Sequence, residues 1–108
     1  MLLTTTNDFS GKTIKEYRGV IFGEVINGID YGKDIMASFR NFSGGRVHEY
    51  EDELIKSRAD AINEMISRAE QIGANAIVGV KIDYEPMGAG GMIMVVASGT
   101  AVIVEQNN

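Results

Sequence analysis

The pattern of apolar and polar positions predicts a strand followed by a short helix within residues 14–42. Residues 14–26 are rich in β-branched and aromatic side chains, which is typical of a strand. Gly19 and Gly23 interrupt it and mark bends or points where another backbone comes close. The segment 30–42 then spaces its large apolar side chains at i, i+4 and i+7, which predicts a short helix with one apolar stripe; these side chains are Ile35, Phe39 and Phe42.

Residues 46–72 carry the clearest helical pattern of the chain. A broad apolar band runs along them, wide enough to lie across a sheet. Gly73 stands where a left-handed C-cap belongs, and Arg68 lies in the last turns, where the helix dipole favours a cation. The band consists of Tyr50, Leu54, Ile55, Ala59, Ala61, Ile62, Met65, Ile66, Ala69 and Ile72.

Two further strands are predicted at residues 75–85 and 92–104, joined by a glycine-rich connection at 86–91 into an antiparallel hairpin. In the first of them, the alternation places Val78, Val80, Ile82 and Tyr84 on one face. The order strand, short helix, long helix, strand, strand predicts one α+β domain over residues 1–108, with the long helix packed on one face of an antiparallel sheet.

Two stretches of these strands, residues 19–22 and 92–96, are apolar at both odd and even positions. Such strands require cover on both faces, and one long and one short helix cover only one of them. A second copy of the chain is the simplest cover, because monomers seldom expose an apolar sheet face. We therefore expect a homo-oligomer; the alternative is that the N-terminal segment folds back over the sheet.

Composition narrows the possible partners. The net charge is −5 and the 10 basic residues are scattered along the chain, which argues against nucleic acid. The absence of cysteine excludes disulfides and thiolate chemistry. The longest apolar run, residues 92–97, is far shorter than the ~20 residues that span a bilayer, and no signal-peptide pattern precedes it. We expect a cytoplasmic protein with no membrane partner.

The window "SGGRVHEYEDEL", residues 43–54, contains a cluster of residues that could bind a metal or an anion. His48 and Asp52 are four apart on the predicted helix, with Glu51 beside them, so they could offer ligands to a divalent metal that a second subunit completes. The glycines and Arg46 could instead seat an anion at the helix N-terminus, but four carboxylates crowd that same end. A plain helix start is favoured, since each acidic residue there stabilises the dipole by roughly 0.3–1 kcal/mol.

A second pair of carboxylates, Asp83 and Glu85, points to one face of a predicted strand. Such a pair can shift one pKa against the other for acid–base catalysis, but it also suits a solvated strand end. The pattern places no histidine base or hydroxyl nucleophile nearby. We therefore expect no enzymatic activity.

Four blocks, in this order, resemble the YbjQ-like family: "EYRGVIFGEVING", "GGRVHEYEDEL", "GANAIVGVKIDYEPMG" and "MVVASGTAV". The resemblance covers nearly the whole chain. It implies a dodecin-like β-α-β-β subunit assembled as a ring-like homopentamer. Members of this family are labelled heavy-metal-binding proteins and have no established reaction, and a single histidine without cysteine gives that label little support.

The resemblance supplies no catalytic residue. Its matched polar positions suit a subunit interface or a shared ligand pocket, and the candidates are Arg46, Tyr50, Glu51, Asp83 and Glu85. The function we expect is a non-enzymatic binding or structural role in a homo-oligomer. The alternative is a protein that binds a divalent or heavy metal through His48, Asp52 and nearby carboxylates.

Overall fold

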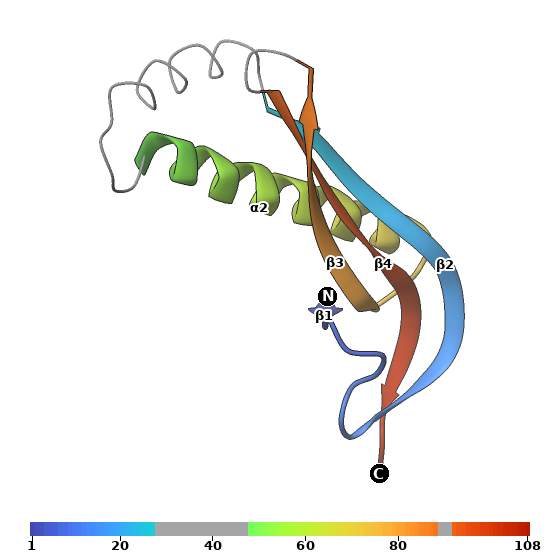
Figure 1. The fold of residues 1–108 in the computed structure, drawn as a ribbon. Coiled ribbons are helices and arrows are strands. Elements are labelled where there is room, and N and C mark those ends of the chain that lie inside the picture. Colours follow the sequence, from blue (N-terminus) through green and yellow to red (C-terminus); the bar gives the residue numbers. More distant parts are fainter. Residues whose placement is uncertain (28–47, 89–91) are drawn as a thin grey trace.

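The computed structural model describes residues 1–27, 48–88 and 92–108, and the side chains of residues 48–50 lie outside that description. Four strands form one sheet in the order β1-β3-β4-β2, and α2 lies across one of its faces (Figure 1). The predicted α+β class, with a long helix on one face of the sheet, is confirmed. The helix predicted within residues 30–42 lies outside the described residues. The elements are β1 (Leu2–Leu3), β2 (Lys12–Ile26), α2 (His48–Gln71), β3 (Ala76–Met87) and β4 (Met92–Gln106).

The sheet is mixed because of β1, which the sequence pattern did not predict. The two-residue strand β1 pairs in parallel with the start of β3, whereas the long ladders β2–β4 and β3–β4 are antiparallel. Consequently β2 forms one edge of the sheet along its whole length. The other edge is β1 at one end and the uncovered part of β3 at the other. Pro86, which has no N–H to donate, lies in this uncovered part of β3, where a strand tolerates it.

The C-terminus of α2 ends in the predicted glycine cap. Gly73 has a φ of 80°, and its N–H donates to the carbonyl of Glu70 at 3.0 Å. The N–H of Ala74 donates to the carbonyl of Ala69, also at 3.0 Å. This pair of bonds is a Schellman motif, which satisfies the last helical carbonyls and turns the chain sharply into β3.

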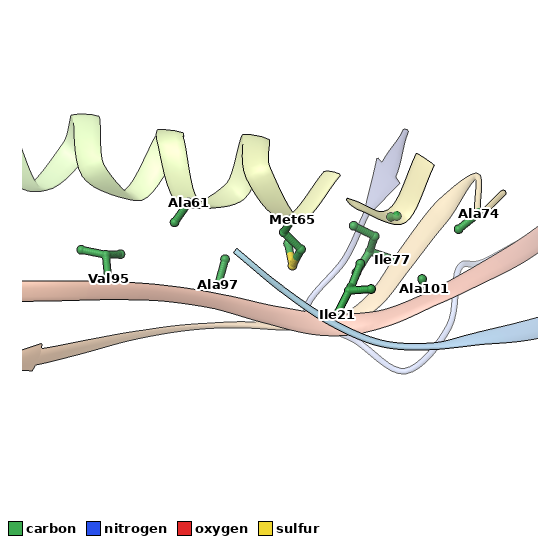
Figure 2. Packing of buried hydrophobic residues seen from close by; sticks show 9 residues of the cluster. Ile21, Ala61, Met65, Ala74, Ile77, Val95, Ala97 and Ala101 are labelled. Atoms are coloured by element: carbon green, nitrogen blue, oxygen red, sulfur yellow. The ribbon is translucent and has the colours of Figure 1, made fainter. Parts of the chain in front are cut away.

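The main core lies between α2 and the sheet (Figure 2). From the helix come Ala61, Met65 and Ala69, all fully buried. Small alanines allow the helix to approach closely, and a Cβ added to Gly23 of β2 would lie 1.9 Å from the carbonyl oxygen of Ala61. The expectation that a second backbone approaches one of the glycines of this strand is therefore confirmed at Gly23. The sheet contributes Ile21, Ile77, Val95, Ala97 and Ala101.

A second, smaller cluster lies on the opposite face of the sheet, where Phe9 and Ile14 pack on Val102 and its neighbours Ala76, Val78 and Val104. The N-terminal arm, residues 4–11, brings Phe9 there. It is tied to β3 by the N–H of Gly79 donating to Thr6 O at 2.8 Å and that of Val80 donating to Thr4 O at 3.0 Å. The N-terminal segment thus does fold back over the sheet, but only at this end.

The prediction that Val78, Val80, Ile82 and Tyr84 share one face of β3 is wrong for Val78. Val78 belongs to the cluster under the N-terminal arm, while Val80 and Ile82 pack against the core under α2. The register with β4 shifts between Val78 and Lys81, and Gly79 within this shift has a φ of 62°. The bulge inserts an extra residue and exchanges the two faces of the strand, so strict alternation fails across it.

Candidate functional site

The face of the sheet opposite α2 carries an uncovered row of apolar side chains along β2. Alternation within the strand turns Ile21 and Gly23 toward α2, and it turns Val20, Phe22 and Ile26 away from it. The register places Phe22 opposite Ser98 and Ile26 opposite Met94 of β4. The N-terminal arm does not cover this upper part of the face.

We call this row the β2 stripe: Tyr17, Val20, Phe22 and Ile26, exposed by 70%, 68%, 46% and 55%. An aromatic side chain buries about 150–250 Å² when fully enclosed, so Tyr17 and Phe22 alone present roughly 200 Å² of surface. With the two aliphatic side chains, the stripe reaches the few hundred Å² at which an apolar patch usually marks a contact site.

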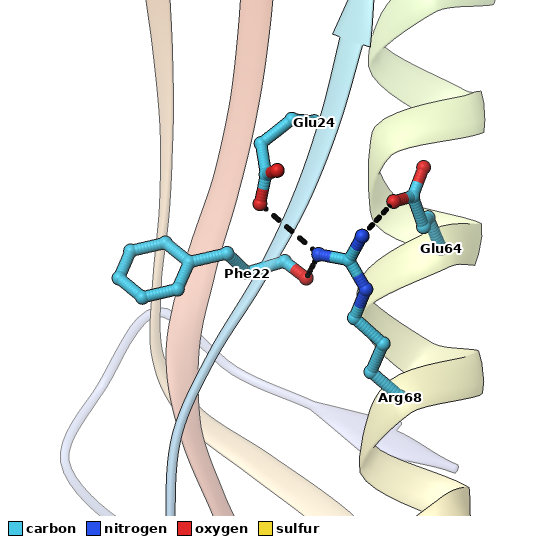
Figure 3. Close-up of polar contacts among 4 residues, drawn as sticks. All are labelled: Phe22, Glu24, Glu64 and Arg68. Atoms are coloured by element: carbon cyan, nitrogen blue, oxygen red, sulfur yellow. Dashed lines mark hydrogen bonds and ion pairs between the residues drawn. The ribbon is translucent and has the colours of Figure 1, made fainter.

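Arg68 of α2 occupies the middle of the outer edge of β2 and binds a main-chain carbonyl there (Figure 3). The guanidinium donates to the main-chain carbonyl oxygen of Phe22 at 2.6 Å and to Glu24 Oε1 at 3.0 Å. Glu64, one turn earlier on α2, also binds this guanidinium and so orients it. Since the Phe22 carbonyl is already bonded, a further strand cannot add across this point of the edge without displacing Arg68.

A second apolar surface lies on the α2 side of the sheet, toward β3. At 100° per residue, Ile55, Ile62 and Ile66 lie about 120–160° around the helix from Arg68, on the flank away from the β2 edge. The helix packs mainly on β2 and β4, which leaves the upper part of β3 incompletely covered. There Ile82 and Tyr84 stand opposite Ala97 and Val95, on the same face as α2.

We call these five residues the α2–β3 patch: Ile55, Ile62, Ile66, Ile82 and Tyr84. Ile55 and Tyr84 are exposed by 51% and 43%, and the other three are half-buried. The β2 stripe and the α2–β3 patch therefore lie on opposite faces of one sheet.

The residues predicted for a metal site are only partly described. His48 and Asp52 both belong to α2, so their spacing of four within one helix is confirmed, but the side chain of His48 lies outside the described residues, as does that of Tyr50. Arg46 precedes the described helix. Asp52 is exposed and Glu51 is half-buried.

The predicted pair on β3 is found on one face. Asp83 lies opposite Val96 and Glu85 opposite Met94, both on the face away from α2. Lys81 Nζ is 3.5 Å from Asp83 Oδ1, whereas Glu85 is exposed. Among the described candidates, Asp83 and Glu85 thus lie on the face of the sheet opposite the one that α2, with Glu51 and Asp52, covers.

The donor chemistry of the described part of the chain does not assemble a metal centre. Over residues 1–27, 48–88 and 92–108, no three or more His, Cys, Asp or Glu side chains are grouped so that they could hold an ion. No helix in the same ranges has the length and apolar character needed to cross a membrane.

The sequence matches a known protein family over nearly its whole length. The model of the YbjQ family, described as "Putative heavy-metal-binding", matches residues 1–105. The chain belongs to this family. The resemblance seen in the four sequence blocks is thereby confirmed.

Relatives from bacteria are similar to this chain over nearly their full length. A "UPF0145 protein" of Clostridium kluyveri is 57% identical over 106 residues, covering 97% of this chain and 100% of the relative. Another, from Acetivibrio thermocellus, is 58% identical with the same coverage. A crystal structure of a DUF74-family protein of unknown function from Pediococcus pentosaceus shares the fold, with a TM-score of 0.55, 16% identity, and coverage of 97% of this chain and 98% of that one. These names assign no reaction to the family.

Sequence reasoning identified the surplus apolar strand face but not the residues that form the stripe. The signal was the unbroken apolar run Val20–Ile21–Phe22, of which only alternate residues stay exposed once the face under α2 is known. The role of Arg68 at the strand edge was also missed. Its spacing of four from Glu64 was visible, but no local pattern shows that the helix end lies beside Phe22.

Proposed function

We propose that the chain is a non-enzymatic subunit of a closed, cytoplasmic homo-oligomer, with a structural or ligand-holding role at its subunit junctions. The observation that carries the proposal is the β2 stripe, which neither α2 nor the N-terminal arm covers. Five subunits is the number implied by the resemblance to the YbjQ-like family.

The energetics favour an apolar partner for this stripe. Fully burying a large apolar side chain is worth about 1.5–3 kcal/mol, and the exposed fractions of the four residues scale this to about 4–7 kcal/mol per subunit. Association itself costs roughly 4–15 kcal/mol. Burial of the stripe therefore offsets a large part of the cost of association only where the stripe meets another apolar surface. A closed ring suits it, because a ring has one more interface than an open row of the same subunits.

Native mass spectrometry tests this proposal, on the protein as purified and again after exhaustive chelation. We expect one species at five times the 11.7 kDa chain mass, unchanged by the chelator. Val20→Asp should break it into smaller species, because it places a charge in the centre of the stripe. Thr13→Asp adds the same charge at another exposed position of β2 and should leave the assembly intact. A monomeric wild-type protein would overturn the proposal.

The second candidate function is binding of a divalent or heavy metal by His48 and Asp52. It is favoured by the description of the family and by the position of both residues on one continuous helix, four apart. We infer that a second subunit supplies further ligands, because no three or more His, Cys, Asp or Glu side chains among the described residues are grouped so that they could hold an ion. A whole-number metal content per subunit or per ring, lost on chelation and in His48→Ala, would establish it.

A further inference from the structure

The two apolar surfaces described above face opposite directions, and this determines how copies of the chain can meet. If the stripe of one copy packed on the stripe of another, the contact would be isologous and would close as a dimer. The α2–β3 patch of both copies would then stay exposed. A contact between the stripe of one copy and the patch of the next would cover both surfaces with one repeated interface.

Charges beside the two surfaces support the second arrangement. Glu85 lies next to Met94 on the face of the stripe, and among the described residues no ion pair engages it. Arg58 follows Ile55 by three positions on α2, is exposed, and likewise has no ion pair within the described part of the chain. Stripe against patch brings the face that carries Glu85 toward the face that carries Arg58, an opposite-charge pair that stripe against stripe does not offer.

The contact of Arg68 with the edge of β2 disfavours a competing mode of assembly, in which a strand of another copy adds to this edge. Strand addition along β2 would require the outward-facing carbonyl groups of this strand, and the one at Phe22 is bonded to Arg68. α2 also lies alongside this edge, as Figure 3 shows for the part around Glu64 and Arg68. The face of β2 remains open while the middle of its edge does not.

From these observations we infer that the β2 stripe of one subunit packs against the α2–β3 patch of the next subunit, front to back. The inference rests on the proposed homo-oligomer and specifies which surfaces build it. Such a contact is heterologous, so it does not close as a dimer; it closes as a ring when each subunit is rotated relative to the one before it. Each subunit then offers one surface and receives the other.

The natural absence of cysteine makes the contact accessible to site-directed cross-linking. Val20→Cys marks the stripe, and Ile55→Cys or Tyr84→Cys marks the patch. Each patch substitution is combined with Val20→Cys in one chain, and the folded oligomer is treated with a short bismaleimide. Val20→Cys combined with Asp60→Cys is the matched control, because Asp60 is exposed on the opposite flank of the same helix.

We expect a ladder of covalent multimers from the stripe–patch doubles, and no ladder from Val20→Cys alone or from the Asp60 control. A covalent dimer from Val20→Cys alone would show stripe against stripe and overturn the inference. An intact oligomer in native mass spectrometry that gives no ladder with either patch position would overturn it too, while leaving the proposed function standing. A monomer would overturn both.

Discussion

Replacing Gly23 with alanine tests the close contact between α2 and β2. The added Cβ would lie 1.9 Å from the carbonyl oxygen of Ala61 and 2.7 Å from the main-chain nitrogen of Met65. An ordinary contact requires about 3.4 Å or more, so the helix must move away from the strand by roughly 1.5 Å. Both obstructing atoms belong to the helix backbone, so no side-chain rotation relieves the clash.

Forcing extra volume into a packed core typically costs about 1–3 kcal/mol, and a rigid backbone obstacle places Gly23→Ala at about 3 kcal/mol or more. The assay is urea unfolding at one fixed protein concentration, with the midpoint compared at unchanged slope. Gly79→Ala is the control: nothing lies within 4 Å of its added Cβ, so only the φ of 62° is penalised, by about 1–2 kcal/mol.

A Met65→Ala substitution should not rescue Gly23→Ala, because the Met65 atom in the way is its main-chain nitrogen. If Gly23→Ala unfolded within 1 kcal/mol of the wild type, or if Met65→Ala restored its stability, the close backbone contact between α2 and β2 would be refuted.

Three further outcomes follow from individual contacts. Arg68→Ala should lower the free energy of unfolding by about 0.5–1.5 kcal/mol in urea titrations, a modest loss because the side chain is 42% exposed, and Arg68→Lys should recover only part of it. Asn75→Ala should cost about 1–3 kcal/mol in the same assay, because the Asn75 side chain bonds both the N–H and the C=O of Val104, at 2.8 and 3.0 Å, and alanine can make neither bond. If the structural role is the right one, the metal content of purified His48→Ala, measured by elemental mass spectrometry, should equal that of the wild type; a lower content would favour the metal-binding function.

The elements with long, regular patterns were predictable from sequence, and so was the cap at Gly73. The 24 residues of α2 and the strands β2 and β4, of 15 residues each, carry enough periodic positions to indicate their type and approximate bounds. β1 was not predictable, because two residues show no periodicity and their pairing with Ala76 and Ile77 depends on a partner far along the chain.

The sequence predicted that an apolar sheet face stays uncovered, but not which residues form it. The apolar surplus in β2 and β4 indicated an uncovered face, yet the bulge at Gly79 exchanges the two faces of β3, and only the folded register reveals it. The carboxylates Asp83 and Glu85 were correctly placed on one face. Their separation from the acidic start of α2 depends on which face the helix covers, and alternation along a strand does not determine that choice.

The pairing of β2 with β4 also governs when this protein can fold. Lys12 pairs with Gln106, 94 residues later in the chain, so β2 is synthesised long before its partner strand. At roughly 5–20 residues per second, translation leaves β2 without β4 for several seconds, while its apolar residues are still unprotected. The hairpin of β3 and β4 forms from neighbouring residues, whereas closing the sheet over such separations is slow. We therefore expect the nascent chain to depend on holding chaperones until β4 has been synthesised, and truncated chains that end before β4 to be recovered only as aggregates.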